Sequence, residues 1–407
     1  MRDDAGLGGE AAILIEALPR GTLLHGRYRI KRVLGGGAAG VLFAAADEQA
    51  GQNVAVKVLH PTLVERREVL LRFRREAEVA RRIRHPNLVA VLGFGASEEG
   101  LHYIVMELLQ GEDLGRVLDR GVPPNRDQLA VDVLTAVLAA LWVVHEAGIV
   151  HRDIKPANIF IWRTAEQQGI KILDFGLAQD FEDQGGLTMT GEILGTPIYM
   201  SPEQARGELV DARADLYSVS CVGYELLCGK PPILKGSPYL TMLAHVDEIP
   251  VRPSVLRPEL PRSIDGLLMR GLEKEAGDRF LSASEMLEAL CAAAPDLGVE
   301  HPPFDDLTRS VEVAVRALQQ SWGLEPAPDE TVVDFSADAI FKRAVGGKPG
   351  RDTVPAPSQV PALASSPAPS PVAVRAAPPT RGRVPVAIWW ALAAIAGAGT
   401  AAWLLLR

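Results

Sequence analysis

Residues 151–176, HRDIKPANIFIWRTAEQQGIKILDFG, constrain the fold more than any other part of the chain. Three polar side chains, Asp153, Asn158 and Asp174, fall within a short and otherwise apolar segment. The oxygens of Asn158 and Asp174 suit Mg²⁺, and the carboxylate of Asp153 suits a hydroxyl nucleophile. A loop that gathers such groups between apolar strands is hard to explain by stability alone. A polar surface hairpin is the alternative interpretation.

Composition limits the class of protein. The chain has 407 residues, of which 47% are hydrophobic, enough for a large core with room for tails. Its net charge of -9 gives no basic footprint, so we expect no nucleic acid partner. The three cysteines, Cys221, Cys228 and Cys291, have no metal-ligand spacing and indicate thiols in a reducing compartment. Residues 1–26 carry no signal peptide and are predicted to be a flexible leader.

The hydrophobic pattern predicts two lobes that divide near residue 108. Short β-branched runs separated by glycine predict an antiparallel meander from Tyr28, followed by a helix over 65–84 and strands near 88–94 and 102–107. Beyond residue 110 the helices are predicted at 126–147, 214–227, 264–271 and 284–293. The chain thus predicts a β-rich lobe over 27–108 and a helical lobe over 109–290. A crevice between two lobes is a common place for a ligand.

The region after residue 290 predicts a connection to a membrane. Residues 291–349 are expected to be partly helical, with helical periodicity over 307–322. Residues 350–383 are rich in Pro, Ala, Ser and Val and predict an extended linker. Residues 384–406 contain no charged residue, and about 23 residues in a helix span roughly 34 Å, enough to cross a bilayer. A buried core helix is the alternative for this last segment.

Charges around the apolar segment predict its orientation. Arg375, Arg381 and Arg383 precede it and only Arg407 follows, so the positive-inside rule places the N-terminal part in the cytoplasm. We therefore expect a single-pass protein of the inner (cytoplasmic) membrane that contacts the lipid bilayer through 384–406. Small residues recur every four positions in this segment, at Ala393, Gly397 and Ala401. Such spacing lets two helices pack closely in a homodimer, or it reflects an alanine-rich composition alone.

Two features of the first lobe suit a phosphate ligand. Residues 35–40, GGGAAG, lie between two predicted strands, and glycine lets the backbone approach phosphate oxygens closely. A plain flexible turn is the alternative, and the strand-loop-strand context argues against a dinucleotide fold. Lys57, in VAVKVL, should face an anion, either a phosphate or a carboxylate such as Glu76 on the next helix. An exposed edge lysine is the alternative there.

HRDIKPAN, DFG, the glycine loop and VAVK, in this order, resemble the protein kinases. The resemblance covers about residues 27–290. GRYRI, FRREAEVARRIRHPNLV, IVHRDIKPANIF and GTPIYMSPEQ most resemble bacterial serine/threonine kinases of the eukaryotic, or Hanks, type. The resemblance implies an α+β bilobal protein-kinase fold, ATP and Mg²⁺ (or Mn²⁺) as cofactors, and transfer of phosphate to protein Ser/Thr hydroxyls.

The same resemblance implies roles for individual residues. Asp153 would orient the hydroxyl and accept its proton, Lys155 would lie near the γ-phosphate, and Asn158 with Asp174 would bind the metal. Met106 would be the gatekeeper, and 107–109 the hinge that meets adenine. The residues that would contact ATP are Leu34, Gly35, Gly37, Gly40, Leu42, Ala55, Lys57, Glu76, Met106, Glu107 and Leu109.

The resemblance also implies an activation segment over 174–203. Thr188 and Thr190 are the candidate phosphorylation sites, and their phosphates would bind Arg152. Thr196, with Lys155, is typical of serine/threonine kinases. Two structural roles follow as well. Glu203 would pair with Arg279, and Asp215 would brace the catalytic loop.

Outside the kinase-like region, Thr331 is followed three residues later by Asp334, which resembles ligands of forkhead-associated domains. An ordinary linker threonine is the alternative. For the whole chain, two other functions stay open: a nucleotide-binding pseudokinase scaffold and a small-molecule phosphotransferase of the same fold. The complete set of catalytic residues argues against the first, and GTPIYMSPEQ, suited to docking a peptide, argues against the second.

Overall fold

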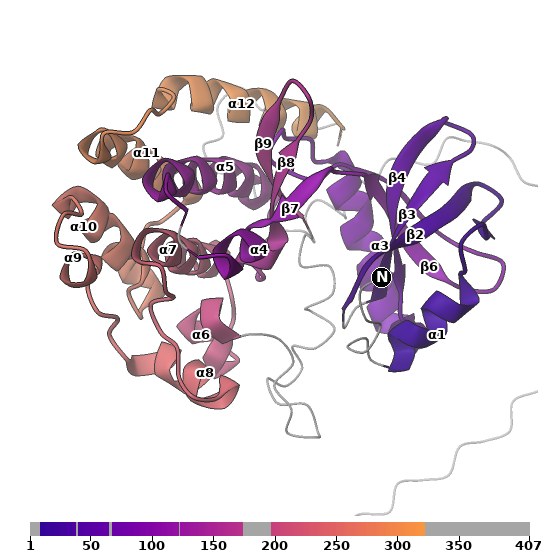
Figure 1. The fold of residues 1–407 in the computed structure, drawn as a ribbon, viewed down its shortest axis with the longest axis horizontal. Helices are drawn as coiled ribbons and strands as arrows, with labels where there is room; N and C mark the ends of the chain where they lie inside the picture. Colours follow the sequence, from indigo (N-terminus) through magenta and orange to yellow (C-terminus); the bar gives the residue numbers. More distant parts are fainter. Residues whose placement is uncertain (1–8, 38–39, 65–66, 122, 174–196, 322–407) are drawn as a thin grey trace, which may run out of the picture. The chain divides into compact units, whose positions relative to one another are not determined.

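The computed structural model describes residues 9–37, 40–64, 67–121, 123–173 and 197–321. All of them belong to one compact unit of the chain, Met1–Lys348. Within this unit, a β-rich first lobe is followed by a mainly helical second lobe (Figure 1). The predicted division into two lobes is confirmed.

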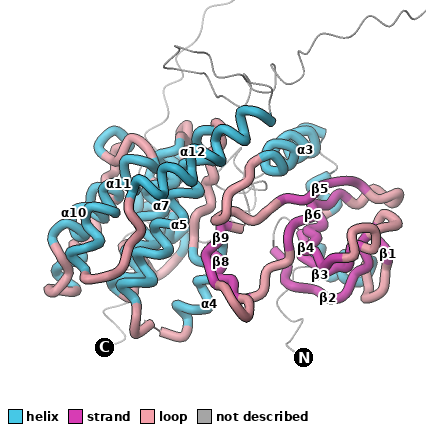
Figure 2. The backbone as a smooth tube through the Cα atoms, turned by 90° about the horizontal axis from the view of Figure 1, so that it is seen from above, coloured by secondary structure: helices cyan, strands magenta, loops and turns pink. Residues whose placement is uncertain are grey.

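The first lobe is built on a six-stranded antiparallel sheet (Figures 1 and 2). Its spatial order is β1-β2-β3-β4-β6-β5, so only the last two strands are exchanged relative to the chain. The strands are β1 (Leu23–Leu24), β2 (Tyr28–Gly37), β3 (Gly40–Asp47), β4 (Gln52–Leu59), β5 (Val91–Ala96) and β6 (His102–Glu107). The meander predicted from the β-branched runs is therefore present, with the glycine loop as the turn between β2 and β3.

The two faces of this sheet pack against different helices, because side chains alternate along each strand. On one face, residues such as Phe43, Val54 and Val56 form a core with α1 (Gly9–Ala17). On the other face, Ala55 and Met106 join the core that contains α3. The connecting helices of this lobe are α2 (Pro61–Val64) and α3 (Arg67–Arg82).

Helix α1 corrects the prediction of a flexible leader over residues 1–26, which is wrong for the described residues 9–26. Ala11, Leu14 and Leu18 of this segment are between 1% and 5% exposed. They cover an apolar sheet face that would otherwise contact water, which offsets the entropy of ordering the segment. The following residues form β1 and pair with β2.

The second lobe surrounds one buried helix, α5 (Arg126–Glu146), which has thirteen buried residues. A three-stranded sheet contacts the first lobe through Ile172. It consists of β7 (Gly111–Asp113), which precedes α5 in the chain, and of β8 (Ile159–Arg163) and β9 (Gln168–Ile172), which follow it. The other helices are α4 (Leu114–Asp119), α6 (Pro202–Arg206), α7 (Ala212–Cys228), α8 (Pro238–Asp247), α9 (Pro253–Leu256), α10 (Arg262–Gly271), α11 (Ala283–Ala293) and α12 (Phe304–Ser321).

Helix α5 also bears on the membrane question. Among the described residues, it is the one helix long and apolar enough to cross a membrane, but 72% of its most apolar window is buried inside the lobe. It is therefore explained as the core of the second lobe. The predicted linker at 350–383 and membrane segment at 384–406 lie outside the described residues.

Helix α12 gives structure to part of the region after residue 290, as predicted. It packs along α5 and α11 (Figure 2), and it buries Val311, Ala314 and Leu318. Phe304, at its start, stacks on Trp142 of α5 with ring centroids 6.4 Å apart. Thr331, Ala393, Gly397 and Ala401 lie outside the described residues.

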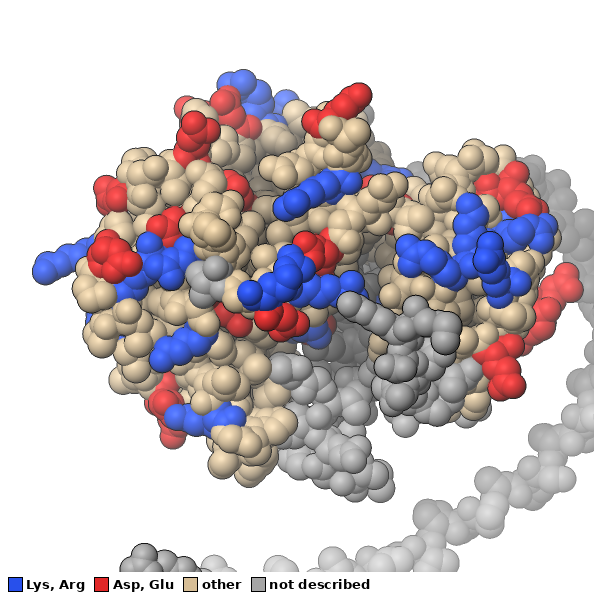
Figure 3. All heavy atoms as spheres, in the orientation of Figure 1, with Lys and Arg blue, Asp and Glu red and all other residues tan. Residues whose placement is uncertain are grey.

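The charged side chains are mixed in sign. Figure 3 shows acidic and basic groups interspersed over the helical lobe on the face that it draws. Several are paired, as in the contacts of Arg120 with Glu112 and of Arg213 with Asp211. Pairs of opposite sign weaken the field that either group would produce alone.

Candidate active site

Several predicted ATP-binding residues of the first lobe come together on the sheet face that packs against α3, here called the inner face. In the strand register, Leu42 lies opposite Lys57, and Ala55 lies opposite Met106. Partners in register share a face, and so do residues two apart on one strand. Leu34 on β2 packs against the same core as Leu42. The side chain of Glu76, the predicted partner of Lys57, lies outside the described residues.

The glycine loop is held in place at Gly40. This residue has a φ of +154°, and a Cβ placed on it would lie 2.0 Å from the carbonyl oxygen of Val58 on β4. Only glycine fits such a close approach of two backbones. Gly37 pairs with Gly40 across the turn, whereas a Cβ on Gly35 or Gly37 would meet no atom of the described part of the chain within 4 Å.

The hinge is fixed through the side chain of Glu107. Its Oε1 atom accepts hydrogen bonds from the backbone N–H of Ala90 at 2.7 Å and from Nζ of Lys171 at 2.7 Å. Lys171, on β9, also donates to the carbonyl of Leu88 at 3.1 Å. This network joins the hinge to both lobes, and Leu109 follows it as a half-buried residue against the core.

Sequence reasoning assigned Glu107 to the hinge but missed Lys171. The signal was present: Lys171 stands between Ile170 and Ile172 on a predicted strand, the same pattern that singled out Lys57. A lysine in such a position needs an anionic or polar partner because its charge is costly to bury.

The catalytic loop brings Asp153, Lys155 and Asn158 together. Oδ2 of Asp153 lies 2.8 Å from Nζ of Lys155 and accepts a hydrogen bond of 2.8 Å from Nδ2 of Asn158. The same Nδ2 donates to the backbone carbonyl of Asp153 at 2.8 Å. A turn of 3-10 helix, Pro156–Asn158, makes this possible by folding the chain back toward Asp153. The three polar groups are thus one connected cluster.

Asp215, on α7, holds the backbone that leads to Asp153. Its carboxylate accepts the N–H of His151 at 2.8 Å and the N–H of Arg152 at 2.7 Å, and it is fully buried. His145 donates to it from Nε2 at 2.8 Å. Burial raises the pKa of the Asp215 carboxyl group, but these hydrogen bonds outweigh burial and hold the pKa below its ordinary value. The predicted contact between Asp215 and the catalytic loop is present.

Of the two predicted metal ligands, Asn158 and Asp174, the structure describes only Asn158. Nδ2 of Asn158 is engaged by Asp153, which leaves its Oδ1 atom as the oxygen that suits Mg²⁺. The N–H of Leu173 donates a hydrogen bond of 2.8 Å to the carbonyl of Asn158. Leu173, the residue before Asp174, therefore lies next to Asn158. Asp174 itself lies outside the described residues. On the side of Asn158, the donor chemistry fits a hard divalent cation.

Arg152 has a left-handed backbone conformation, with a φ of 64°. A non-glycine residue in this region is uncommon and is held by its surroundings. Its carbonyl accepts a hydrogen bond of 2.9 Å from Nε2 of Gln204 on α6. This contact links the catalytic loop to α6, the helix in which the predicted activation segment ends at Glu203. Thr188, Thr190 and Thr196 lie outside the described residues.

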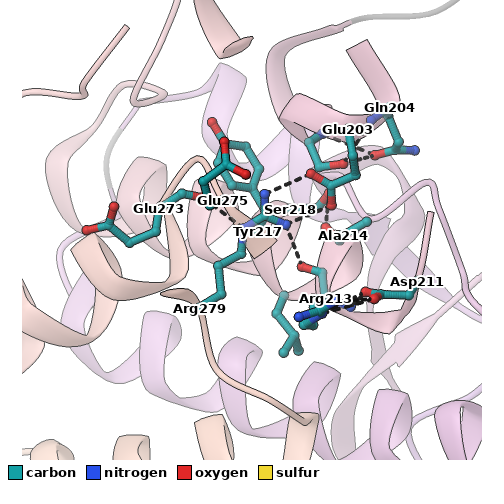
Figure 4. Close-up of polar contacts among 12 residues, drawn as sticks. Glu203, Gln204, Asp211, Arg213, Ala214, Tyr217, Ser218, Glu273, Glu275 and Arg279 are labelled. Atoms are coloured by element: carbon teal, nitrogen blue, oxygen red, sulfur yellow. Dashed lines mark hydrogen bonds and ion pairs between the residues drawn. The ribbon is translucent and has the colours of Figure 1, made fainter. Parts of the chain in front are cut away.

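The predicted ion pair of Glu203 and Arg279 is present and buried (Figure 4). Nη1 and Nη2 of Arg279 donate to the two carboxylate oxygens of Glu203 at 2.7 and 2.8 Å. The proline that the family usually has before this arginine is missing from LEKEAGDRF, yet the pair forms. Burial raises the pKa of Glu203, but the guanidinium outweighs it and the pKa lies below its ordinary value.

Comparison with known proteins agrees with this geometry. Residues 28–290, more than half of the chain, match the family described as "Protein kinase domain". The chain belongs to the protein kinase family. Within that family, the chain is similar to bacterial serine/threonine-protein kinases.

Two curated relatives and one solved structure illustrate the similarity. A probable serine/threonine-protein kinase of Streptomyces coelicolor is 41% identical over 269 residues, which cover 65% of this chain and 39% of that protein. The serine/threonine-protein kinase PknB of Mycobacterium leprae is 40% identical over 268 residues, covering 65% and 42%. The PknI kinase domain of Mycobacterium tuberculosis has a TM-score of 0.54 and 32% identity, covering 67% of this chain and 98% of that one. The chain thus spans about two fifths of the two curated relatives.

Proposed function

We propose that this chain transfers the γ-phosphoryl group of ATP to serine and threonine hydroxyls of proteins. The observation that carries the proposal is the cluster of Asp153, Lys155 and Asn158, joined by two contacts of 2.8 Å on a loop that buried Asp215 holds by its backbone. Phosphoryl transfer depends mainly on positioning and on neutralising charge, and this cluster supplies both.

Each residue has a defined part in the proposed reaction. Asp153 orients the substrate hydroxyl and accepts its proton, and Lys155 places a positive charge beside the phosphoryl group in transit. Asn158, through Oδ1, and Asp174 would hold Mg²⁺, which when bound neutralises charge on the phosphate oxygens. Lys57 would bind the α- and β-phosphates, and the inner face around Ala55 and Met106 would receive adenine.

The experiment is a transfer assay with labelled ATP, Mg²⁺ and a generic protein substrate. Asp153→Asn keeps the shape of the side chain but cannot accept the proton, so we expect transfer to fall by at least about 100-fold. ATP binding should be retained, because Asp153 contacts the hydroxyl and not adenine. Binding without transfer by the wild-type chain would favour a pseudokinase scaffold, and transfer to small alcohols alone would favour a small-molecule phosphotransferase.

We further propose that the activation segment is phosphorylated at Thr188 and Thr190 by another copy of the chain. The contact of Gln204 with the Arg152 carbonyl supports this, because it couples the segment's end to the catalytic loop. A phosphate added to either threonine would bind the Arg152 guanidinium. Replacing both threonines by alanine should lower activity sharply, and unchanged activity would refute the proposal.

The location and partners are proposed from the sequence of the remaining chain. The uncharged segment 384–406 would anchor the protein in the inner membrane with the kinase lobes in the cytoplasm. Its small residues would support a homodimer, and phosphorylated Thr331 would bind a forkhead-associated domain. Fractionation of cells that express the chain with and without 384–406 tests the anchor: recovery of both forms in the soluble fraction would refute it.

A further inference from the structure

His60 lies directly after β4 and contacts the glycine loop. Its side chain is buried, with 3% exposed, and its Nε2 atom lies 2.9 Å from the carbonyl oxygen of Gly37. A carbonyl oxygen can only accept a hydrogen bond, so Nε2 must carry the hydrogen in this contact. The imidazole therefore donates to the last residue of β2.

This contact joins two strands that are not neighbours in the sheet. The order β2-β3-β4 places β3 between Gly37 and His60. At this level of the sheet, Gly37 lies opposite Gly40, and Gly40 lies opposite Leu59. The ladder hydrogen bonds between neighbouring strands do not by themselves connect the end of β2 to β4, and the side chain of His60 does.

Gly37 is a residue whose conformation needs such a restraint. Glycine has more backbone freedom than any other residue, and ordering it costs more entropy. A Cβ on Gly37 would meet no atom of the described residues within 4 Å, so packing against these residues does not restrict Gly37. The hydrogen bond from His60 fixes the direction of the Gly37 carbonyl at the end of β2.

We propose that His60 is a positioning residue that orders the glycine loop before ATP binds. This inference rests on the proposed function, since it takes the glycine loop to cover the phosphates. His60 lies three residues after Lys57, so the strand that carries the phosphate-binding lysine also carries the group that orders the loop. When Gly37 is already held in place, less conformational entropy is lost at this residue on binding, which lowers the cost of binding.

The test compares two variants of similar size. His60→Gln keeps an N–H donor near the position of Nε2, and His60→Met fills the site without a donor. For His60→Met we expect KM for ATP to rise about five- to tenfold, the effect of one net hydrogen bond. His60→Gln should stay within about twofold of wild type. KM for the protein substrate should be unchanged in both.

The outcomes separate positioning from stability. If His60→Met leaves KM for ATP unchanged, or if both variants raise the two KM values equally, the proposal is overturned. Thermal midpoints without nucleotide, measured for both variants, show whether either one simply unfolds. Should His60→Met unfold, a Gln variant that binds ATP like wild type supports the proposal, and one that binds at least tenfold more weakly refutes it.

Calorimetric titration of each form with ATP and Mg²⁺ keeps this inference distinct from the proposed function. If the wild-type chain binds ATP without transferring phosphate, the proposed function fails, and the affinities of the two variants still decide the role of His60. If the wild-type chain does not bind ATP, both proposals fail.

Discussion

The buried guanidinium of Arg279 gives a sharp prediction about what holds the second lobe together. It donates five hydrogen bonds, two to Glu203 and three to backbone carbonyls, at distances of 2.7 to 3.1 Å (Figure 4). Its carbon Cζ also lies 5.0 Å from the centroid of the Tyr217 ring. Arg279→Met keeps most of the apolar stem but removes every donor. Glu203 and three carbonyl groups then lose their partner.

The expected loss follows from the unpaired charge. Removing one partner of a buried ion pair costs about 3–5 kcal/mol, because the other charge stays buried without compensation. At about 2–4 °C per kcal/mol for a domain of this size, the midpoint of thermal unfolding should fall by about 6–20 °C. The thermal midpoint of Arg279→Lys should lie between those of wild type and Arg279→Met. Lysine keeps the positive charge, but its three N–H donors all come from one nitrogen.

The assays are urea denaturation, which measures the free energy of unfolding, and thermal unfolding of the purified chain, with Arg213→Met as the matched control. The side chain of Arg213 pairs with Asp211, which is 53% exposed, so its loss should cost at most about 1 kcal/mol. Adding Glu203→Gln to Arg279→Met removes the unpaired charge and should restore part of the stability. The reasoning is wrong if Arg279→Met is as stable as Arg213→Met, or if the second substitution restores nothing.

Two further predictions concern the glycine loop and acid stability. Gly40→Ala would place a Cβ 2.0 Å from the Val58 carbonyl oxygen, so KM for ATP should rise at least about tenfold. Gly35→Ala adds a Cβ that meets none of the described atoms within 4 Å, so its KM for ATP should stay near that of wild type. Equal KM values for the two variants in kinetic assays would contradict this prediction. The second prediction concerns His85, whose pKa is lowered to about 4 by burial and by the nearby charge of Lys171. As the pH falls below 6.5, this histidine takes up a proton in the unfolded chain but not in the folded chain. Stability should therefore fall from pH 6.5 to 4, and His85→Asn, which keeps an acceptor for the Asn87 N–H, should flatten that slope in thermal unfolding scans at several pH values.

The sequence predicts those parts of the fold that depend on local pattern. The strands of the first lobe are short runs rich in apolar residues, and glycine marks the turn between β2 and β3, so the meander follows from the sequence alone. The short helices α4 and α6 were not predicted, because six and five residues are too few to show a helical period. Their start is visible only in the capping groups: Asp113 and Ser201 accept backbone N–H groups at the two N-termini.

The leader illustrates a different limit. Ala11, Leu14 and Leu18 have helical spacing, so the signal for α1 was available in the sequence. What the sequence does not contain is the surface that the helix covers. The outer face of the sheet, with Phe43 and Val56, exists only once the strands have paired. A short apolar segment becomes a helix because of that tertiary contact.

The candidate site, too, was predicted only in part. The types of its residues are readable from the sequence, but their support is not. Lys171 lies sixty-four positions from Glu107, and His60 lies twenty-three from Gly37, so neither contact follows from spacing. The sequence motifs identify the groups that would touch ATP, and the structure adds the residues that hold these groups in position.

Helix α7 explains why the catalytic loop and the end of the activation segment depend on one another. Asp211 caps its first turn, and Asp215, one turn later, accepts the backbone N–H groups of the catalytic loop. In the same turns, the carbonyl of Arg213 accepts a hydrogen bond from Arg279, and Ser218 donates to the carbonyl of Tyr199. Within eight residues, one buried helix therefore contacts both segments. A shift of this helix would move the groups around Asp153 and the anchor of Glu203 together, so a rigid α7 is a condition for the proposed reaction.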